Sequence, residues 1–122
     1  MNENERKRFT TDNRKARNQA AGYHKAHAQY KKLLDNFAKP GYSILDDVAT
    51  EILFDIGVEN KNVIQLCCNN GREILSVKNL GTGRCVGVDQ SEAFLEQTNE
   101  LATAGNIECE FIQSDVYELP EN

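Results

Sequence analysis

The chain lacks a long apolar run: 39% of its 122 residues are hydrophobic, and they are spread along the sequence. No segment offers the roughly 20 consecutive apolar residues that a membrane-spanning helix needs. The polar, charged N-terminus has no apolar core of the kind that marks a secretory signal. The length fits one domain with a modest hydrophobic core. These absences predict a cytoplasmic protein that does not span a membrane.

Metal-binding patterns are also missing. The cysteines are Cys67, Cys68, Cys85 and Cys109. This spacing does not match that of zinc ligands, so we interpret all four as small buried apolar residues in a reducing compartment. His24 and His27 lie one helical turn apart, but no carboxylates accompany them, which favours packing or surface roles. We therefore expect no metal site.

Charge is distributed unevenly along the chain. Residues 1–40 carry a net charge of +6, residues 41–122 carry −11, and the whole chain carries −5. A basic first third could attract nucleic acid, but no interleaved aromatic platform or binding motif accompanies it. We interpret this segment as a solvated helix that partly complements an acidic body, and we expect no nucleic-acid partner.

The first 60 residues have a helical pattern. Residues 1–9 are expected to be a disordered, charged tail, and residues 10–60 a helical cap. Steps of three and four between apolar residues predict a helix over residues 11–37, with Gly22 marking a bend or break. Its apolar face would be Ala16, Ala20, Tyr23, His27, Tyr30, Leu34 and Phe37.

A second helix is predicted after the Pro40-Gly41 break. Ser43 resembles an N-cap with Asp46 three residues later, which predicts a helix from Ile44 to about Phe54. Gly57 is a suitable stop for this helix.

Residues 61–122 have the pattern of a β-α-β-α-β unit. The expected elements are a strand at Val63–Cys67 buried on both faces, a helix at Gly71–Leu80, a strand at Arg84–Asp89, a helix from Ser91 to about Ala104, and a strand at Ile107–Gln113. Right-handed crossovers predict a parallel sheet with the strand order 3-2-1. The fold class is therefore α/β and Rossmann-like.

The expected strand ends carry residues suited to a nucleoside. Gly71 allows the backbone to approach a ligand, and Asp89, 18 positions later, can accept hydrogen bonds from ribose hydroxyls. Asp115 can accept from the exocyclic amine of a purine, with the Val116 amide addressing a ring nitrogen. A GxGxxG loop is absent, which argues against a dinucleotide.

These motifs resemble those of class I S-adenosylmethionine-dependent methyltransferases, and more closely a bacterial methyltransferase-domain group. The matching segments are Pro40–Ser43, Gln65–Glu73, Cys85–Asp89 and Asp115–Tyr117. The resemblance implies S-adenosyl-L-methionine as cofactor, S-adenosyl-L-homocysteine as product, and an unidentified small molecule as methyl acceptor. It assigns no catalytic side chain.

The resemblance also implies binding roles. The methionine-side loop would be Gln65, Cys67, Cys68, Asn69, Asn70 and Gly71, and Asp89 would hold the ribose. The adenine side would use Gln90, Ser114, Asp115 and Val116. Tyr42, Tyr23 and His27 would cover the methionine end. Of the glycines in the family's acidic-x-Gly-x-Gly-x-Gly loop, only Gly71 is present.

Family members continue with four more strands, so the resemblance implies a partial three-layer sandwich, truncated relative to the seven-stranded fold. Val63–Cys67 would then be an apolar edge strand, which favours pairing. We therefore expect a homodimer through this edge or through the N-terminal helices. Two alternatives to a methyltransferase stay open: a non-catalytic S-adenosylmethionine-binding protein that works as a dimer, and another Rossmann-like nucleotide-binding module.

Overall fold

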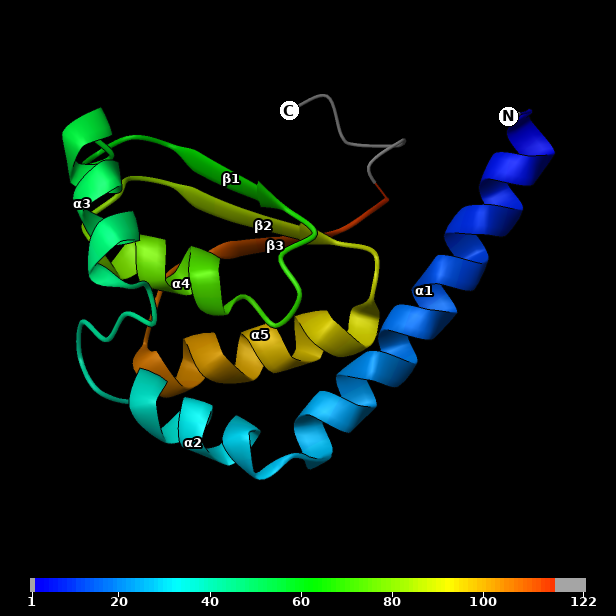
Figure 1. The fold of residues 1–122 in the computed structure, drawn as a ribbon, viewed down its shortest axis with the longest axis horizontal. Helices are drawn as coiled ribbons and strands as arrows, with labels where there is room; N and C mark the ends of the chain where they lie inside the picture. The colour runs from blue at the N-terminus through cyan, green and yellow to red at the C-terminus, as the bar shows by residue number, and fades with distance from the viewer. Residues whose placement is uncertain (1, 116–122) are drawn as a thin grey trace.

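A computed structural model describes residues 2–115 of the chain (Figure 1). The predicted contact of Val116 therefore lies outside the described residues. The elements in chain order are α1 (Glu3–Ala26), α2 (Ala28–Phe37), α3 (Asp47–Ile56), β1 (Val63–Leu66), α4 (Arg72–Asn79), β2 (Cys85–Asp89), α5 (Glu92–Gly105) and β3 (Glu110–Gln113).

The three strands form one parallel sheet in the order β1-β2-β3, which confirms the predicted topology. Val63 pairs with Cys85, and Val86 pairs with Glu110. Both crossovers place their helices, α4 and α5, on the same side of the sheet (Figure 1). The fold is a partial Rossmann-like arrangement, with β1 at an edge of the described sheet.

β1 is not buried on both faces as predicted. Val63 packs against the core around Ile74, on the side that α4 covers. Ile64 and Leu66 point the other way and are 59% and 46% exposed. A run of apolar residues cannot reveal which faces are covered, because that depends on which helices pack there.

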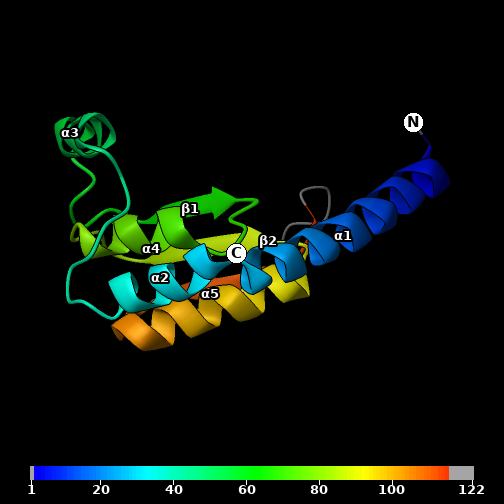
Figure 2. The same ribbon diagram turned by 60° about the horizontal axis from the view of Figure 1, so that its bottom comes forward.

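Helix α5 lies between the sheet and the N-terminal helices (Figures 1 and 2). Its Leu101 is fully buried with Phe37 of α2 and Leu75 of α4. Burying a side chain of this size stabilises a fold by about 1.5–3 kcal/mol. This packing attaches α2 to the strand-bearing part of the chain.

The expected disordered tail at residues 1–9 is wrong for the part that the structure describes. Helix α1 begins at Glu3, because Asn2 and Glu5 form a reciprocal capping box. The Asn2 side chain accepts from the Glu5 amide at 2.8 Å, and Glu5 accepts from the Asn2 amide at 3.3 Å. Such a box satisfies amides that the first helical turn leaves unpaired.

The predicted helix over residues 11–37 is two helices, and the break lies at His27 rather than Gly22. His27 is extended, with φ −79° and ψ 140°, and its Nδ1 accepts from the Gln29 amide at 3.2 Å. The break changes the buried face: Tyr23 is 70% exposed, whereas Tyr30 and Phe37 are buried. The predicted packing of Ala16, Tyr23 and His27 is therefore wrong, because one non-helical residue rotates the two faces relative to each other.

The N-cap of α3 is Asp46, not Ser43. The Asp46 carboxylate accepts from the Ala49 amide at 2.7 Å. Ser43 instead accepts from the Leu45 amide at 3.2 Å in a local turn. Gly57 ends the helix in the left-handed region at φ 83°, as predicted.

Glu100 on α5 holds both N-terminal helices. Its carboxylate accepts from the Tyr30 hydroxyl at 2.5 Å and pairs with Lys25 at 3.0 Å. The hydrogen bond from Tyr30, followed by that from Lys25, lowers the pKa of Glu100.

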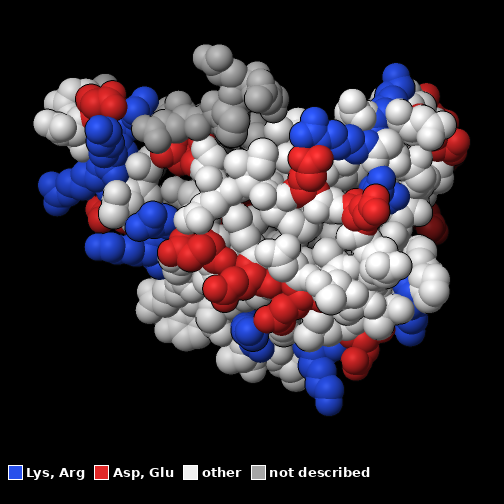
Figure 3. All heavy atoms as spheres, turned by 180° about the vertical axis from the view of Figure 1, so that it is seen from behind, with Lys and Arg blue, Asp and Glu red and all other residues white. Residues whose placement is uncertain are grey.

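Seen from behind, an acidic band crosses the region of α5, while basic side chains gather toward α1 (Figure 3).

We expect Glu100 to make stability depend on pH. Its pKa is lower in the folded chain, so its contribution is present above the ordinary glutamate pKa of about 4.3 and is lost as pH falls through the folded value. Tyr30→Phe removes the larger cause of the shift. Urea unfolding at pH ~6 and pH ~3 should show a smaller loss of stability on acidification for Tyr30→Phe than for the wild type. An equal loss in both proteins would contradict the assignment.

Candidate functional site

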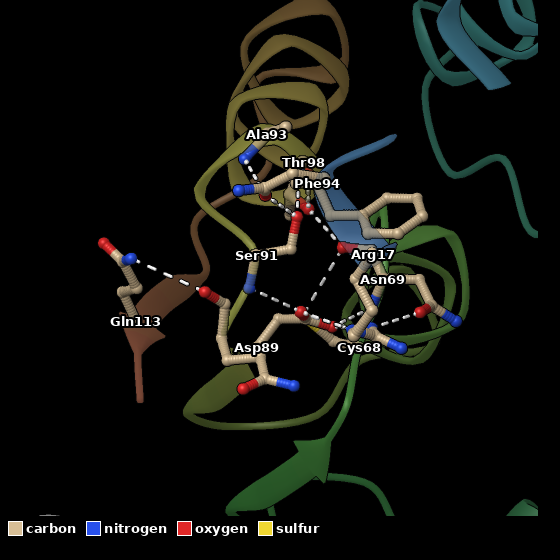
Figure 4. Close-up of polar contacts among 11 residues, drawn as sticks. Arg17, Cys68, Asn69, Asp89, Ser91, Ala93, Phe94, Thr98 and Gln113 are labelled. Atoms are coloured by element: carbon tan, nitrogen blue, oxygen red, sulfur yellow. Dashed lines mark hydrogen bonds and ion pairs between the residues drawn. The ribbon is translucent and has the colours of Figure 1, made fainter. Parts of the chain in front are cut away.

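The carboxyl ends of β1 and β2 meet around Asp89 (Figure 4). The turn after β1 contains three left-handed residues: Cys67 at φ 55°, Asn69 at φ 54° and Gly71 at φ 78°. Between them, the Cys68 amide donates to the Val88 carbonyl at 2.9 Å. This turn brings the Asn69 amide back to within 2.9 Å of Asp89 Oδ2.

Asp89 is buried, and its side chain is 0% exposed. Its Oδ1 accepts from the Ser91 amide at 2.9 Å and from Arg17 Nε at 3.2 Å. Its Oδ2 accepts from the Asn69 amide and from Arg17 Nη2. Asp89, the residue predicted to bind the ribose, therefore has both carboxylate oxygens hydrogen-bonded to donors of the chain itself.

Arg17 is the site residue that sequence reasoning missed. It projects from α1 and also donates to Asn69 Oδ1 at 2.5 Å (Figure 4). Its guanidinium carbon lies 5.4 Å from the centre of the Phe94 ring, close enough for a cation–π contact. Residues 1–40 carry ten Lys and Arg residues, and no local pattern marks this one. Only the packing of α1 against the strand ends identifies it.

Neighbouring contacts attach α1 beside Asp89. Asn18 Oδ1 accepts from the Ser91 hydroxyl at 2.5 Å. One turn further, Gln97 Nε2 donates to the Ala21 carbonyl at 2.6 Å. The start of α5 is thus tied to α1 through both side-chain and backbone groups.

The turn after β1 is supported from α5. The Thr98 hydroxyl lies 3.1 Å from the Asn69 carbonyl oxygen, and Gly71 packs directly against Thr98. Asn70 is buried, at 4% exposure. Gln65 Oε1 is buried with no hydrogen-bond partner within the described part of the chain. Glu73 Oε2 and Gln97 Oε1 are likewise buried without a partner there, so the Gln65 oxygen is one of several positions that could accept from a further donor.

Two cavities are lined in part by residues close in sequence to Arg17 and Asp89. One of 560 Å³ is lined by Tyr23, His27, Tyr42 and Asn70, among others. The structure thus gathers the residues predicted to cover the methionine end. Tyr42 also contacts Phe37 edge to face, with ring centroids 4.9 Å apart.

The other cavity, of 370 Å³, lies on the predicted adenine side. Gln90, Ser114 and Asp115 line it together with residues of α1 that include Lys7 and Arg14. Along α1, Arg17 lies between the residues that line this cavity and those that line the 560 Å³ cavity. The residues predicted to contact the two ends of the ligand therefore line two separate cavities, and Arg17 lies between the two sets along α1.

Cys67 is exposed, so the prediction that all four cysteines are buried is wrong for this residue. It lies directly after the last residue of β1, in the left-handed turn. Cys68 is buried, and burial, with the nearby charge of Asp89 as a smaller cause, raises the pKa of its thiol to about 12. Burial also raises the pKa of Cys109 to about 12.

We expect iodoacetamide to modify Cys67 well before Cys68. A thiol of pKa about 12 is ionised to roughly one part in 10,000 at pH ~8, and only the thiolate reacts. Peptide mapping by mass spectrometry after short labelling should find the label on Cys67, and Cys67→Ser should remove it. Equal labelling of the two neighbours in folded protein would contradict the assigned burial.

Within residues 2–115, no group of three or more His, Cys, Asp or Glu residues could hold a metal ion. No helix of this part of the chain is long and apolar enough to cross a membrane.

Residues 63–122 match the family model described as a methyltransferase domain. The match begins at the first residue of β1 and includes the turn, Asp89 and Asp115. This segment, just under half of the chain, is similar to the methyltransferase-domain family, which supports a methyltransferase-type function. No curated protein matches the chain.

Proposed function

We propose that the protein binds S-adenosyl-L-methionine at the carboxyl ends of its strands, as a methyltransferase or as the cofactor-binding portion of one. The observation that carries the proposal is the position of Asp89. It ends β2 beside a glycine-containing turn after β1, which is where open α/β sheets bind nucleoside ligands. The family match over residues 63–122 supports the same assignment.

Each part of the proposed site has a distinct task. The turn from Gln65 to Gly71 and the 560 Å³ cavity would hold the methionine end, with the unpaired Gln65 oxygen available to accept from the ligand's amine. Asp89 would accept from the ribose hydroxyls. Gln90, Ser114 and Asp115, which line the 370 Å³ cavity, would contact the adenine.

Methyl transfer requires mainly alignment from the protein. S-adenosylmethionine supplies a sulfonium whose methyl group is already electrophilic, so positioning and exclusion of water account for much of the rate. We assign no general base. A small-molecule acceptor and a cytoplasmic setting, which suits four free cysteines, complete the proposal.

Calorimetry with S-adenosylmethionine, S-adenosylhomocysteine and NAD tests the ligand class. We expect the first two ligands to bind and NAD not to bind. Binding of NAD alone would favour the alternative of another Rossmann-like nucleotide-binding module. Binding of both S-adenosyl compounds, without methyl transfer to any of a panel of small-molecule acceptors, would favour the non-catalytic alternative.

We also propose a homodimer through the β1 edge. Ile64 and Leu66 are exposed beside an unpaired strand edge in the described sheet, and such an edge favours pairing between chains. Sedimentation at tens of micromolar should show a dimer for the wild type and a shift toward monomer for Ile64→Lys. A wild-type monomer would overturn the proposal.

A further inference from the structure

The acceptor capacity of Asp89 is fully used within the chain. A carboxylate offers about four lone-pair positions for hydrogen bonds. Four donors take them: the amides of Asn69 and Ser91, and Nε and Nη2 of Arg17. With its side chain 0% exposed, Asp89 has no free surface for a further donor. The two hydroxyls of a ribose could bind only if two of these donors leave.

Arg17 supplies the two donors that can leave. The Asn69 and Ser91 amides belong to the turn after β1 and to the start of α5, so moving them would break the strand ends. Arg17 instead reaches Asp89 from a separate helix, and 23% of its side chain is exposed. Its release leaves the Asn69 and Ser91 amides in place and opens two acceptor positions on Asp89, which the incoming ribose hydroxyls can fill.

We propose that α1 is an autoinhibitory latch: Arg17 occupies the place of the ribose hydroxyls, and a ribose-bearing ligand binds only after Arg17 leaves Asp89. This inference rests on the proposed function, because it takes Asp89 as the residue that binds the ribose. It adds that the chain's own helix competes for that residue.

The positions of the cavities support competition at one point. Tyr23 and His24 line the cavity on one side of Arg17, and Thr11 and Arg14 line the cavity on the other. Release of Arg17 would remove a side chain that projects from α1 between these two sets of lining residues. A linear ligand with an amino-acid end and a purine end would then reach both cavities and place its ribose at Asp89.

Competition of this kind weakens the apparent affinity for the ligand, which can be measured. When only a fraction of the molecules is open, the apparent dissociation constant rises by the inverse of that fraction. A variant without the guanidinium should therefore bind more tightly than the wild type. A residue that held the ligand directly would have the opposite effect when removed.

The test is calorimetry of the full chain with S-adenosylhomocysteine, comparing wild type, Arg17→Ala and Arg8→Ala. Arg8 is an exposed arginine on the same helix and serves as the control for loss of charge. We expect Arg17→Ala to lower the dissociation constant by about tenfold and Arg8→Ala to leave it unchanged. Arg17→Lys, which keeps the charge but loses the two-pronged contact, should fall between wild type and Arg17→Ala.

The outcomes separate the two proposals. If wild type and both Arg17 variants fail to bind, the proposed function fails and the latch fails with it. If wild type binds and Arg17→Ala binds equally or more weakly while its circular dichroism is unchanged, the latch alone is overturned. Should Arg17→Ala not fold, Arg17→Lys decides, because a latch requires it to bind more tightly than wild type.

Discussion

Asp89→Ala should lower the free energy of unfolding by about 3 kcal/mol and weaken S-adenosylhomocysteine binding by roughly tenfold to a hundredfold. Removing one partner of a buried ion pair typically costs about 3–5 kcal/mol. We take the lower end because Arg17 is partly exposed and can turn toward solvent. The Asn69 and Ser91 amides lose their acceptor at the same time.

Glu110→Ala is the matched control for Asp89→Ala. Glu110 forms a two-pronged pair with Arg84 at 2.7 Å for both contacts, but both side chains are more than half exposed. Solvent screens exposed pairs of this kind and they contribute little to stability, so this variant should unfold close to wild type. Urea unfolding followed by calorimetry on the folded proteins measures both effects. Equal stability losses for the two variants would show that Asp89 is not the buried centre of the site, and unchanged affinity in folded Asp89→Ala would remove the ribose assignment.

Gly71→Ala should cost about 3 kcal/mol of folding free energy. Gly71 is left-handed at φ 78°, and a Cβ there would lie 2.4 Å from Thr98 Cγ2. Left-handed backbone costs a non-glycine residue about 1–2 kcal/mol, and overpacking a core adds about 1–3 kcal/mol. The same clash would displace the turn that holds the Asn69 amide against Asp89, so ligand affinity should fall as well.

Two variants separate the backbone strain at Gly71 from the clash. Gly41 has a similar φ of 71°, and a Cβ there would meet nothing within 4 Å, so Gly41→Ala should cost only the backbone strain. Thr98→Ser removes the clashing methyl group and keeps the hydroxyl beside the Asn69 carbonyl. In the double variant with Gly71→Ala it should recover part of the lost stability. Equal losses for Gly41→Ala and Gly71→Ala, measured by urea unfolding, would exclude the clash as a cause.

Local signals in the sequence were sufficient for the type and order of the elements in the strand-bearing half of the fold. Ser91 caps α5 by accepting from the Phe94 amide, and Gly57 ends α3, as the residue types predicted. The handedness of crossovers then determined the order of the strands, which in turn placed Asp89 and the turn after β1 together. Each of these features depends on residues close in sequence or on a general rule of chain geometry.

Two errors in the predicted helices arose at positions where a local capping signal was present but was not interpreted as one. The Asn2 and Glu5 capping box is visible in the sequence, yet the charged composition of residues 1–9 suggested disorder. The break at His27 is not marked by glycine or proline. Histidine acts there as the N-cap of α2, with its ring nitrogen accepting from the Gln29 amide. A small displacement of a break is enough to move Tyr23 from a predicted buried face into solvent.

The sequence by itself determined the parallel sheet, the similarity of residues 63–122 to the methyltransferase domain, and the position of Asp89 at the end of β2. Only the tertiary structure decided that Arg17, 72 residues away in the chain, takes the acceptor positions of that carboxylate. The same is true of the exposed face of β1, where Ile64 and Leu66 remain uncovered. The physical reason is that a strand's periodicity and a carboxylate's chemistry are local, whereas what packs against them depends on helices distant in sequence.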